Sequence, residues 1–336
     1  MVRLYTDHPR YQNDIADELR LFEGREDIVP GDADECDVSV TLKEENGVWH
    51  ARARVFLFSN TSEYEYTRPA VKGGLIDITR NEKRAMKIAV FRALKAGTGF
   101  APPWGSLTGI RPTRLLRELI QSSGEAEAIR MMADDFDVLP EKLDLARQIV
   151  AVQGPIIASQ AATDADVYVN IPFCTTKCLY CSFPSAVRTA KTDMDGYIAA
   201  LIRDINEGAK VIEESGRRVR AMYMGGGTPT VLSESELQRV LDALHAAYPD
   251  FCGEFTVEAG RPDTINAGKL AVMRRAGVTR ISVNPQSMNA ETLALIGRSH
   301  APEDVERAFI EAREAGFDNI NMDIIPGLPG EGIPQM

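Results

Sequence analysis

Three cysteines stand close together in the run VYVNIPFCTTKCLYCSFPS, at positions 174, 178 and 181. They have Cx3Cx2C spacing and directly follow an apolar run that is typical of a strand. A structural zinc site would need a fourth ligand, and none of the four histidines lies nearby in sequence. The spacing of Cys174, Cys178 and Cys181 therefore favours a [4Fe-4S] cluster over zinc or unligated thiols. Three ligands leave one iron open to a small chelating molecule.

Further residues suited to ligand binding follow other strand-like runs. The run MYMGGGTPT carries three glycines, which either let the backbone approach a ligand or simply form a tight turn. Polar side chains appear at the ends of later apolar runs or shortly after them, namely Glu258, Gln286, Arg298 and Asp323. Ligands gather at the carboxyl ends of parallel strands, so we expect these residues on the same rim as the cysteines.

The elements that must position these residues alternate along the second half of the chain. The patterns predict strands at Val167–Ile171, Ala221–Met224, Glu254–Glu258, Arg280–Val283 and Asn319–Ile324. Between them, amphipathic helices are predicted near 193–214, 234–247, 266–276 and 302–315. Repeated β-α units indicate a parallel sheet, either open or rolled into a barrel.

The first half of the chain follows a different pattern. Residues 1–98 combine a helix over 13–22 and one over 82–95, closing at Gly97, with alternating runs such as VRLYT, DVSVTL, VWHARARVFLF and EYEYTR. We interpret them as a small α+β module. Residues 99–165 begin with APPWGSLTGIRPTR and continue as a helical connector, which leads into the β-α region at 166–336. The chain stops just after the fifth predicted strand, and we therefore expect it to be a truncated part of a longer protein.

Composition narrows the classes of function. Acidic residues outnumber basic ones by 49 to 38, which disfavours binding to nucleic acid, including an RNA-modifying role. No apolar run is long enough to span a membrane, and the N-terminus lacks a signal peptide. Five cysteines, three of them clustered, argue against a disulfide framework. We expect a cytoplasmic protein.

The cysteine run, with Tyr180 just before its last cysteine, resembles the signature of the radical S-adenosylmethionine (SAM) superfamily. The resemblance implies that SAM chelates the open iron and is cleaved to a 5′-deoxyadenosyl radical, which abstracts hydrogen from the substrate. It also implies an α/β fold, a partial (β/α) radical SAM barrel with parallel strands, preceded by the small α+β domain and the helical connector. The implied SAM-site residues are Tyr168, Tyr180, Gly226, Gly227, Thr228, Glu258, Gln286, Arg298 and Asp323. Arg298 would suit the carboxylate of SAM.

Within this superfamily the chain resembles the oxygen-independent coproporphyrinogen III oxidases and dehydrogenases (HemN/HemW-like), and most of all the HemZ branch. The phrases that carry this resemblance are WGSLTGIRPTR, AGRPDTI and INMDIIPGLPGE. It implies oxidative decarboxylation of coproporphyrinogen III to protoporphyrinogen IX in haem biosynthesis, with an electron donor such as a flavodoxin or ferredoxin. Arg111 and Arg114 are candidate partners for the carboxylates of this substrate.

Two positions depart from the oxidase pattern. Asn170 stands where the oxidases have histidine, and Phe183 stands where they have a further cysteine. These changes resemble the related haem-trafficking proteins. A haem-trafficking chaperone on the same scaffold, or an inactive truncated fragment, therefore stays open as an alternative.

Overall fold

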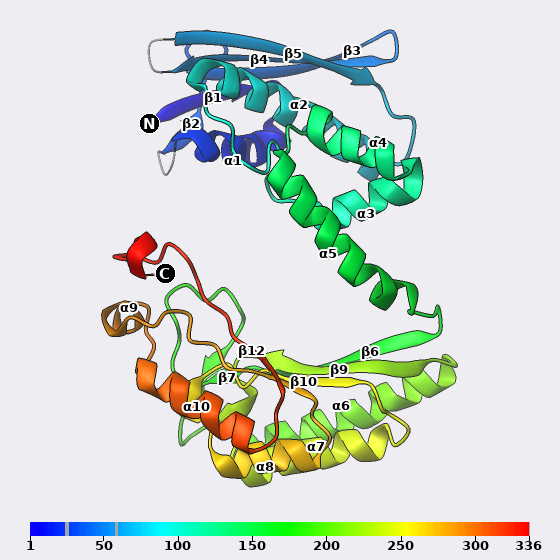
Figure 1. The fold of residues 1–336 in the computed structure, drawn as a ribbon, viewed down its shortest axis with the longest axis vertical. Helices are drawn as coiled ribbons and strands as arrows, with labels where there is room; N and C mark the ends of the chain where they lie inside the picture. The colour runs from blue at the N-terminus through cyan, green and yellow to red at the C-terminus, as the bar shows by residue number, and fades with distance from the viewer. Residues whose placement is uncertain (24–26, 58–59, 336) are drawn as a thin grey trace. The chain divides into compact units, whose positions relative to one another are not determined.

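The computed structural model of the protein describes residues 1–23, 27–57 and 60–335. The chain divides into two compact units, Met1–Ser159 and Gln160–Met336, which we describe in turn. Figure 1 shows the course of the chain through both units.

The N-terminal unit is built on a five-stranded mixed sheet with the order β2-β1-β3-β4-β5. Its strands are β1 (Val2–Thr6), β2 (Ile28–Pro30), β3 (Val38–Glu45), β4 (Val48–Leu57) and β5 (Asn60–Pro69). β1 runs parallel to β2 and β3, whereas β3, β4 and β5 pair antiparallel. The alternating runs of the sequence thus form strands as predicted. The three-residue strand β2 is too short to show alternation, and the sequence analysis missed it.

Two helices, α1 (Gln12–Glu23) and α2 (Leu75–Thr98), pack on this sheet. Their apolar faces share one core with alternate residues of β1, β3 and β4. The predicted start of the second helix, at residue 82, was seven residues late, because Leu75 and Ile76 in its first turn are exposed and add nothing to the apolar face. Its predicted end at Gly97 was also wrong. The helix continues to Thr98, and Gly99 ends it with a left-handed φ of 71°.

The predicted connector forms helices α3 (Pro112–Ser123), α4 (Glu125–Arg130) and α5 (Pro140–Ala158), with a π-helical turn at Met131–Asp135. Their apolar residues pack in one cluster with Ile88 of α2 and Tyr66 of β5. Because of this packing, the stretch up to Ser159 belongs to the same compact unit as the N-terminal sheet. A sequence pattern shows which face of a helix is apolar, but it does not identify the surface that the face packs against.

The C-terminal unit contains a five-stranded sheet with the order β12-β11-β10-β9-β6. Its strands are β6 (Asp164–Ile171), β9 (Arg218–Gly226), β10 (Glu254–Val257), β11 (Arg280–Ser282) and β12 (Asn319–Asn321). All neighbours pair in parallel, so the predicted α/β architecture with parallel strands is confirmed. The sheet is open over the described residues, as expected for a partial barrel.

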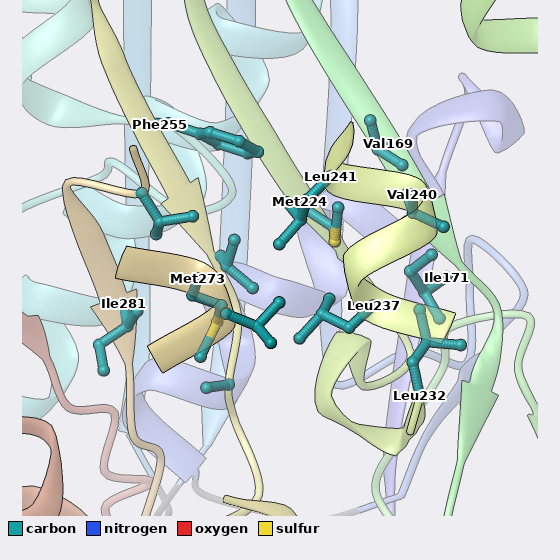
Figure 2. Close-up of a cluster of buried hydrophobic side chains, with 14 of the residues drawn as sticks. Val169, Ile171, Met224, Leu232, Leu237, Val240, Leu241, Phe255, Met273 and Ile281 are labelled. Atoms are coloured by element: carbon teal, nitrogen blue, oxygen red, sulfur yellow. The ribbon is translucent and has the colours of Figure 1, made fainter. Parts of the chain in front are cut away.

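The helices that connect these strands lie along one side of the sheet (Figure 1). They are α6 (Met194–Glu214), α7 (Glu234–Ala247), α8 (Ala267–Arg275) and α10 (Pro302–Glu314), and all four were predicted within a few residues. The short helix α9 (Ala290–Leu295) was not. Figure 2 shows the core between the two layers, where Ile171 and Met224 from the strands meet Leu237 from α7 and Met273 from α8.

The two faces of the sheet differ sharply. Along β6 and β9, Val169, Ile171 and Met224 are buried against the helices, whereas Tyr168 and Tyr223 point to the exposed face. Since all strands are parallel, the segments that follow their carboxyl ends share one edge of the sheet. Over the described residues, no helix has both the length and the apolar character needed to cross a membrane.

Candidate cofactor site

One pocket at the carboxyl edge of the C-terminal sheet gathers nearly all the residues that the sequence singled out. It has a volume of about 250 Å³. Its lining includes Cys174, Cys178, Tyr180, Cys181, Gly226, Gly227, Thr228, Glu258, Gln286, Arg298 and Asp323. These residues come from segments that follow five different strands. Among the predicted SAM-site residues Tyr168 is the exception, because it lies on the open face of the sheet and is not among the lining residues. The predicted substrate partners Arg111 and Arg114 line a different pocket, within the N-terminal unit.

The cysteine loop follows β6 and is held at several points. Its first cysteine lies in the short strand β7 (Phe173–Cys174), which pairs with β8 (Ala186–Val187). Farther along, Thr176 Oγ1 donates a hydrogen bond to Gly297 O at 3.0 Å, and the amide of Leu179 donates to Ile296 O at 3.1 Å. The loop is therefore anchored to the segment after α9, although more than a hundred residues separate the two in sequence.

Two side chains donate hydrogen bonds to cysteine sulfurs. Thr228 Oγ1 lies 3.5 Å from Cys174 Sγ. Arg261 Nη1 lies 3.8 Å from Cys178 Sγ and 3.1 Å from Thr176 O. Arg261 is only 3% exposed and also forms an ion pair with Asp263 at 3.4 Å. Hydrogen bonds and charges beside the sulfurs are among the features that tune an iron–sulfur cluster.

The glycines after β9 allow the backbone to approach the cysteine loop. Gly226 has a φ of 105°, a conformation that other residues rarely adopt. A Cβ atom on Gly227 would lie 2.5 Å from Phe173 O, next to Cys174. The amides of Gly227 and Thr228 donate to Ile171 O at 2.8 Å and to Phe173 O at 2.7 Å. The glycine turn and the start of the cysteine loop are thus packed backbone against backbone.

Glu258 is oriented from the open face of the sheet. The hydroxyl of Tyr223 donates a hydrogen bond to Glu258 Oε1. The ring of Tyr223 stacks in turn on Tyr168, with ring centroids 5.9 Å apart and an interplanar angle of 17°. Burial, together with the hydrogen bond and the charge of Glu258, raises the pKa of Tyr223, so its hydroxyl stays protonated at neutral pH. Tyr168 thus contacts Tyr223, which holds Glu258, and does not itself line the pocket.

Gln286 and Asp323 are joined through their backbones. Gln286 is buried and has a φ of 65°, and its amide donates to Asp323 O at 2.9 Å. The amide of Ile325 donates back to Gln286 O, also at 2.9 Å. A left-handed, non-glycine residue fixed by two hydrogen bonds is a feature of functional sites. This bridge holds the segments after β11 and β12 together at the pocket.

Arg298 reaches into the pocket from the segment after α9. Its Nη1 donates to Gly260 O at 3.2 Å and to Asn284 O at 3.4 Å, and its Nη2 donates to the hydroxyl of Tyr180 at 3.0 Å. Burial raises the pKa of Tyr180, although the charge of Arg298 opposes this effect. The three hydrogen bonds fix the orientation of the Arg298 guanidinium.

The three cysteines line one pocket together with polar atoms that have no partner among the described residues. Among residues 1–23, 27–57 and 60–335, no three Cys, His, Asp or Glu side chains converge on one point as ligands of one metal ion. The thiols of Cys174, Cys178 and Cys181 at this pocket could supply three of the four ligands that a [4Fe-4S] cluster takes. Buried Asn284 Oδ1 and Arg298 Nε also line the pocket, and neither has a hydrogen-bond partner in the described structure. These atoms fit a polar ligand beside the thiols.

Among the lining residues that sequence reasoning missed are two polar ones, Arg261 and Asn284. Both follow strand ends, β10 and β11, and that position was the signal that could have identified them. A lone arginine or asparagine in a loop is usually solvated, so its type alone gave no indication.

Comparisons with known proteins place the chain in a family. Residues 168–335 match the model described as "Radical SAM superfamily". The oxygen-independent coproporphyrinogen-III oxidase-like protein HemZ of Bacillus subtilis is 37% identical over 270 residues, which are 77% of this chain and 54% of the relative. The haem chaperone HemW of Escherichia coli is 36% identical over 170 residues, 50% of this chain and 44% of the relative. The solved structure of coproporphyrinogen III oxidase HemN from Escherichia coli covers 56% of this chain and 42% of its own, with 30% identity and a TM-score of 0.48.

The chain therefore belongs to the radical SAM superfamily, whose members use a [4Fe-4S] cluster and SAM. Within it, the chain is similar to the HemZ and HemW proteins, the resemblance that its motifs predicted. It spans about half the length of the curated relatives that it matches.

Proposed function

We propose that this protein is the SAM-dependent coproporphyrinogen III dehydrogenase of haem biosynthesis. The reaction would remove two propionate carboxyl groups as CO2 and leave two vinyl groups, giving protoporphyrinogen IX. The observation that carries the proposal is the length of the match to the oxidase-like protein HemZ. Its 270 residues are more than residues 160–336 can supply, so the likeness extends into the N-terminal unit.

In this proposal Cys174, Cys178 and Cys181 hold the [4Fe-4S] cluster through their thiolates. When bound, the cluster and SAM supply a 5′-deoxyadenosyl radical that can abstract hydrogen from a propionate side chain. Radical chemistry suits this substrate, because the β C–H bond of a propionate is too weakly acidic for a protein base. An electron donor such as a flavodoxin or ferredoxin would reduce the cluster.

The remaining residues of the pocket would bind and orient SAM. The glycine turn at Gly226 and Gly227 offers backbone groups, and Thr228 adds a hydroxyl. Arg298 would grip a carboxylate with its free Nε, and Glu258 would accept hydrogen bonds from an amino group or ribose. Gln286, Asp323 and Tyr180 complete the polar lining, and Tyr168 supports Glu258 through Tyr223.

A haem chaperone is the second candidate function. The HemW match of 170 residues has a length that residues 160–336 alone can accommodate. The presence of Asn170 and Phe183, in place of the histidine and cysteine of the oxidase pattern, supports this alternative. A chaperone would bind haem stably and release no CO2.

The decisive experiment is anaerobic reconstitution with iron and sulfide, followed by incubation with SAM, a reductant and coproporphyrinogen III. We expect both 5′-deoxyadenosine and CO2, and we expect the Cys178→Ala variant to form neither. Cys252→Ala is the matched control, because Cys252 is exposed and does not line the pocket. A reconstituted cluster that releases no CO2, in a protein that binds haem stoichiometrically in a spectroscopic titration, would favour the chaperone instead.

A further inference from the structure

The N-terminal unit contains a pocket of its own, with a volume of about 420 Å³. It is formed by α1, α2, α3 and the loop from Ser106 to Arg111, so every lining residue lies within Met1–Ser159. Six basic residues line it, namely Arg80, Lys83, Arg84, Lys87, Arg111 and Arg114. This gathering of positive charge stands out in a chain whose formal net charge is −11.

The acidic residues in and behind the pocket neutralise only part of this charge. Each of the three in the lining is already paired with a base, Asp14 with Lys83 at 3.0 Å, Asp17 with Arg20 at 2.6 Å and Glu118 with Arg114 at 2.8 Å. Lys87, a further lining residue, pairs at 3.1 Å with Glu18 behind the pocket.

Three arginines are left over. Within the part of the chain that the structure describes, no carboxylate lies within 4.0 Å of the guanidinium of Arg80, Arg84 or Arg111. Arg80 and Arg84 stand on successive turns of α2, and Arg111 precedes α3. The tertiary structure thus brings three guanidinium groups to the lining of one cavity, and the charges of two of them, Arg80 and Arg84, repel each other.

Arg84 is the least solvated of the three. Its Nε is buried without a hydrogen-bond partner in the described structure, and its guanidinium lies 5.0 Å from the centre of the Phe136 ring. Burial, and then repulsion by Arg68 and Arg80, lowers the pKa of Arg84 to about 10. A buried cation with an unmade hydrogen bond is costly unless an anion compensates it.

We propose that this pocket is a binding site for a small anion that carries carboxylate or phosphate groups. Guanidinium groups bind both kinds of group through paired hydrogen bonds, and Arg80, Arg84 and Arg111 provide three such forks. Phe136 and Leu115 add an apolar wall, which suits a ligand with some carbon framework. The volume suits a small molecule.

The proposal does not rest on the proposed function. It concerns a pocket in the N-terminal unit, and its residues come from the phrase TGIRPTR and from α2. The test needs neither the cluster nor SAM. A failure to release CO2 from coproporphyrinogen III would therefore not bear on this inference. Likewise, a failure of this pocket to bind an anion would not bear on the proposed function.

The experiment is isothermal titration calorimetry on the full chain with two probes, pyrophosphate and citrate, against sodium chloride at equal ionic strength. We expect saturable binding of at least one probe. Arg84→Gln and Arg111→Gln should each weaken it about tenfold, or about 1.4 kcal/mol, because each removes a charged hydrogen-bond donor. Arg54→Gln removes the same charge from an exposed position outside the pocket and should change the affinity less than about twofold.

Preference for pyrophosphate or for citrate would identify the chemical class of the ligand. The absence of saturable binding below about 10 mM for both probes would overturn the proposal. An equal loss of affinity in Arg54→Gln would overturn it too, because binding would then reflect only the overall charge. Arg80 and Arg111 are exposed, so Arg80→Gln and Arg111→Gln keep the test informative even if the variant at the half-buried Arg84 does not fold.

Discussion

Arg261 Nη1 lies 3.8 Å from Cys178 Sγ, although 83 residues separate the two in sequence. The same nitrogen donates to Thr176 O at 3.1 Å, so the guanidinium is held against the cysteine loop. Hydrogen bonds and net charge near the sulfurs set the reduction potential of a cluster. Arg261 is thus placed to act on the cluster without being a ligand.

We therefore expect the Arg261→Gln variant to assemble the cluster at a more negative potential. Loss of the cation should lower the potential by about 50 mV, which corresponds to roughly tenfold in a one-electron equilibrium. The measurement is a redox titration of the reconstituted protein followed by electron paramagnetic resonance. Arg307→Gln, which removes an exposed charge from α10, is the control and should leave the potential unchanged. An equal shift in both variants would rule out a specific contact.

The close approach of Gly227 to the cysteine loop makes a second prediction. A methyl group there would overlap Phe173 O, a backbone atom that cannot rotate away. Gly227→Ala should lower the free energy of unfolding by about 1–3 kcal/mol, as overpacking does, and should reduce the iron content after reconstitution. Gly208→Ala is the matched control in α6, where the added methyl meets only Tyr248 at an ordinary 3.5 Å. That change should stabilise the protein by up to about 1 kcal/mol. Normal iron loading in Gly227→Ala would contradict the prediction.

The third prediction concerns the hydrogen bond from the hydroxyl of Tyr223 to Glu258. Removal of the hydroxyl in Tyr223→Phe leaves Glu258 free to rotate, while the stack of the ring on Tyr168 is kept. We expect SAM to bind about five- to tenfold more weakly, a loss of about 1–1.4 kcal/mol, because the hydrogen bond orients Glu258 without itself touching SAM. Equilibrium dialysis of SAM against the reconstituted protein measures this. Iron content should not change, and Tyr197→Phe, in which a hydrogen bond to Asn170 O is lost, provides a comparison. Unchanged SAM affinity would show that Glu258 needs no such support.

A fourth prediction concerns pH and the N-terminal unit. Glu18 is fully buried, 3.1 Å from Lys87 Nζ, and Thr108 Oγ1 donates to it at 2.5 Å. Burial raises the pKa of Glu18 from 4.5 to about 7, with Lys87 and Thr108 opposing. Between these values the folded state binds a proton that the unfolded state does not, so the free energy of unfolding falls as pH rises through this window.

The Glu18→Gln variant should flatten this slope by at least about 1 kcal/mol between pH 5 and pH 8. Urea unfolding followed by tryptophan fluorescence is suitable, because both tryptophans, Trp49 and Trp104, lie in the N-terminal unit. Glu63→Gln, at an exposed site paired with Arg54, should keep the slope of the parent protein. A slope that persists in Glu18→Gln would mean that Glu18 is ionised throughout.

Much of the C-terminal unit could be read from local patterns. Alternation and the 3.6-residue period located β6, β9, β10, β11 and β12 and the helices between them, since these periods reflect which face of each element is buried. The Cx3Cx2C spacing and the GGG turn are also local features, and they led to the superfamily that residues 168–335 match. The cysteine motif is short because its three cysteines stand on one loop.

The sequence by itself thus determined the parallel α/β architecture, the cysteine loop and the class of cofactor. Only the tertiary structure decided which distant residues meet. It placed Arg261 against Cys178, set Tyr168 behind Tyr223 rather than in the pocket, and brought Arg84 and Arg111 to one cavity. Such pairings depend on strand order and on helix packing, which arise from the burial of whole faces. The periodicity of a single segment shows which of its faces is buried, but it does not show which other element that face will pack against.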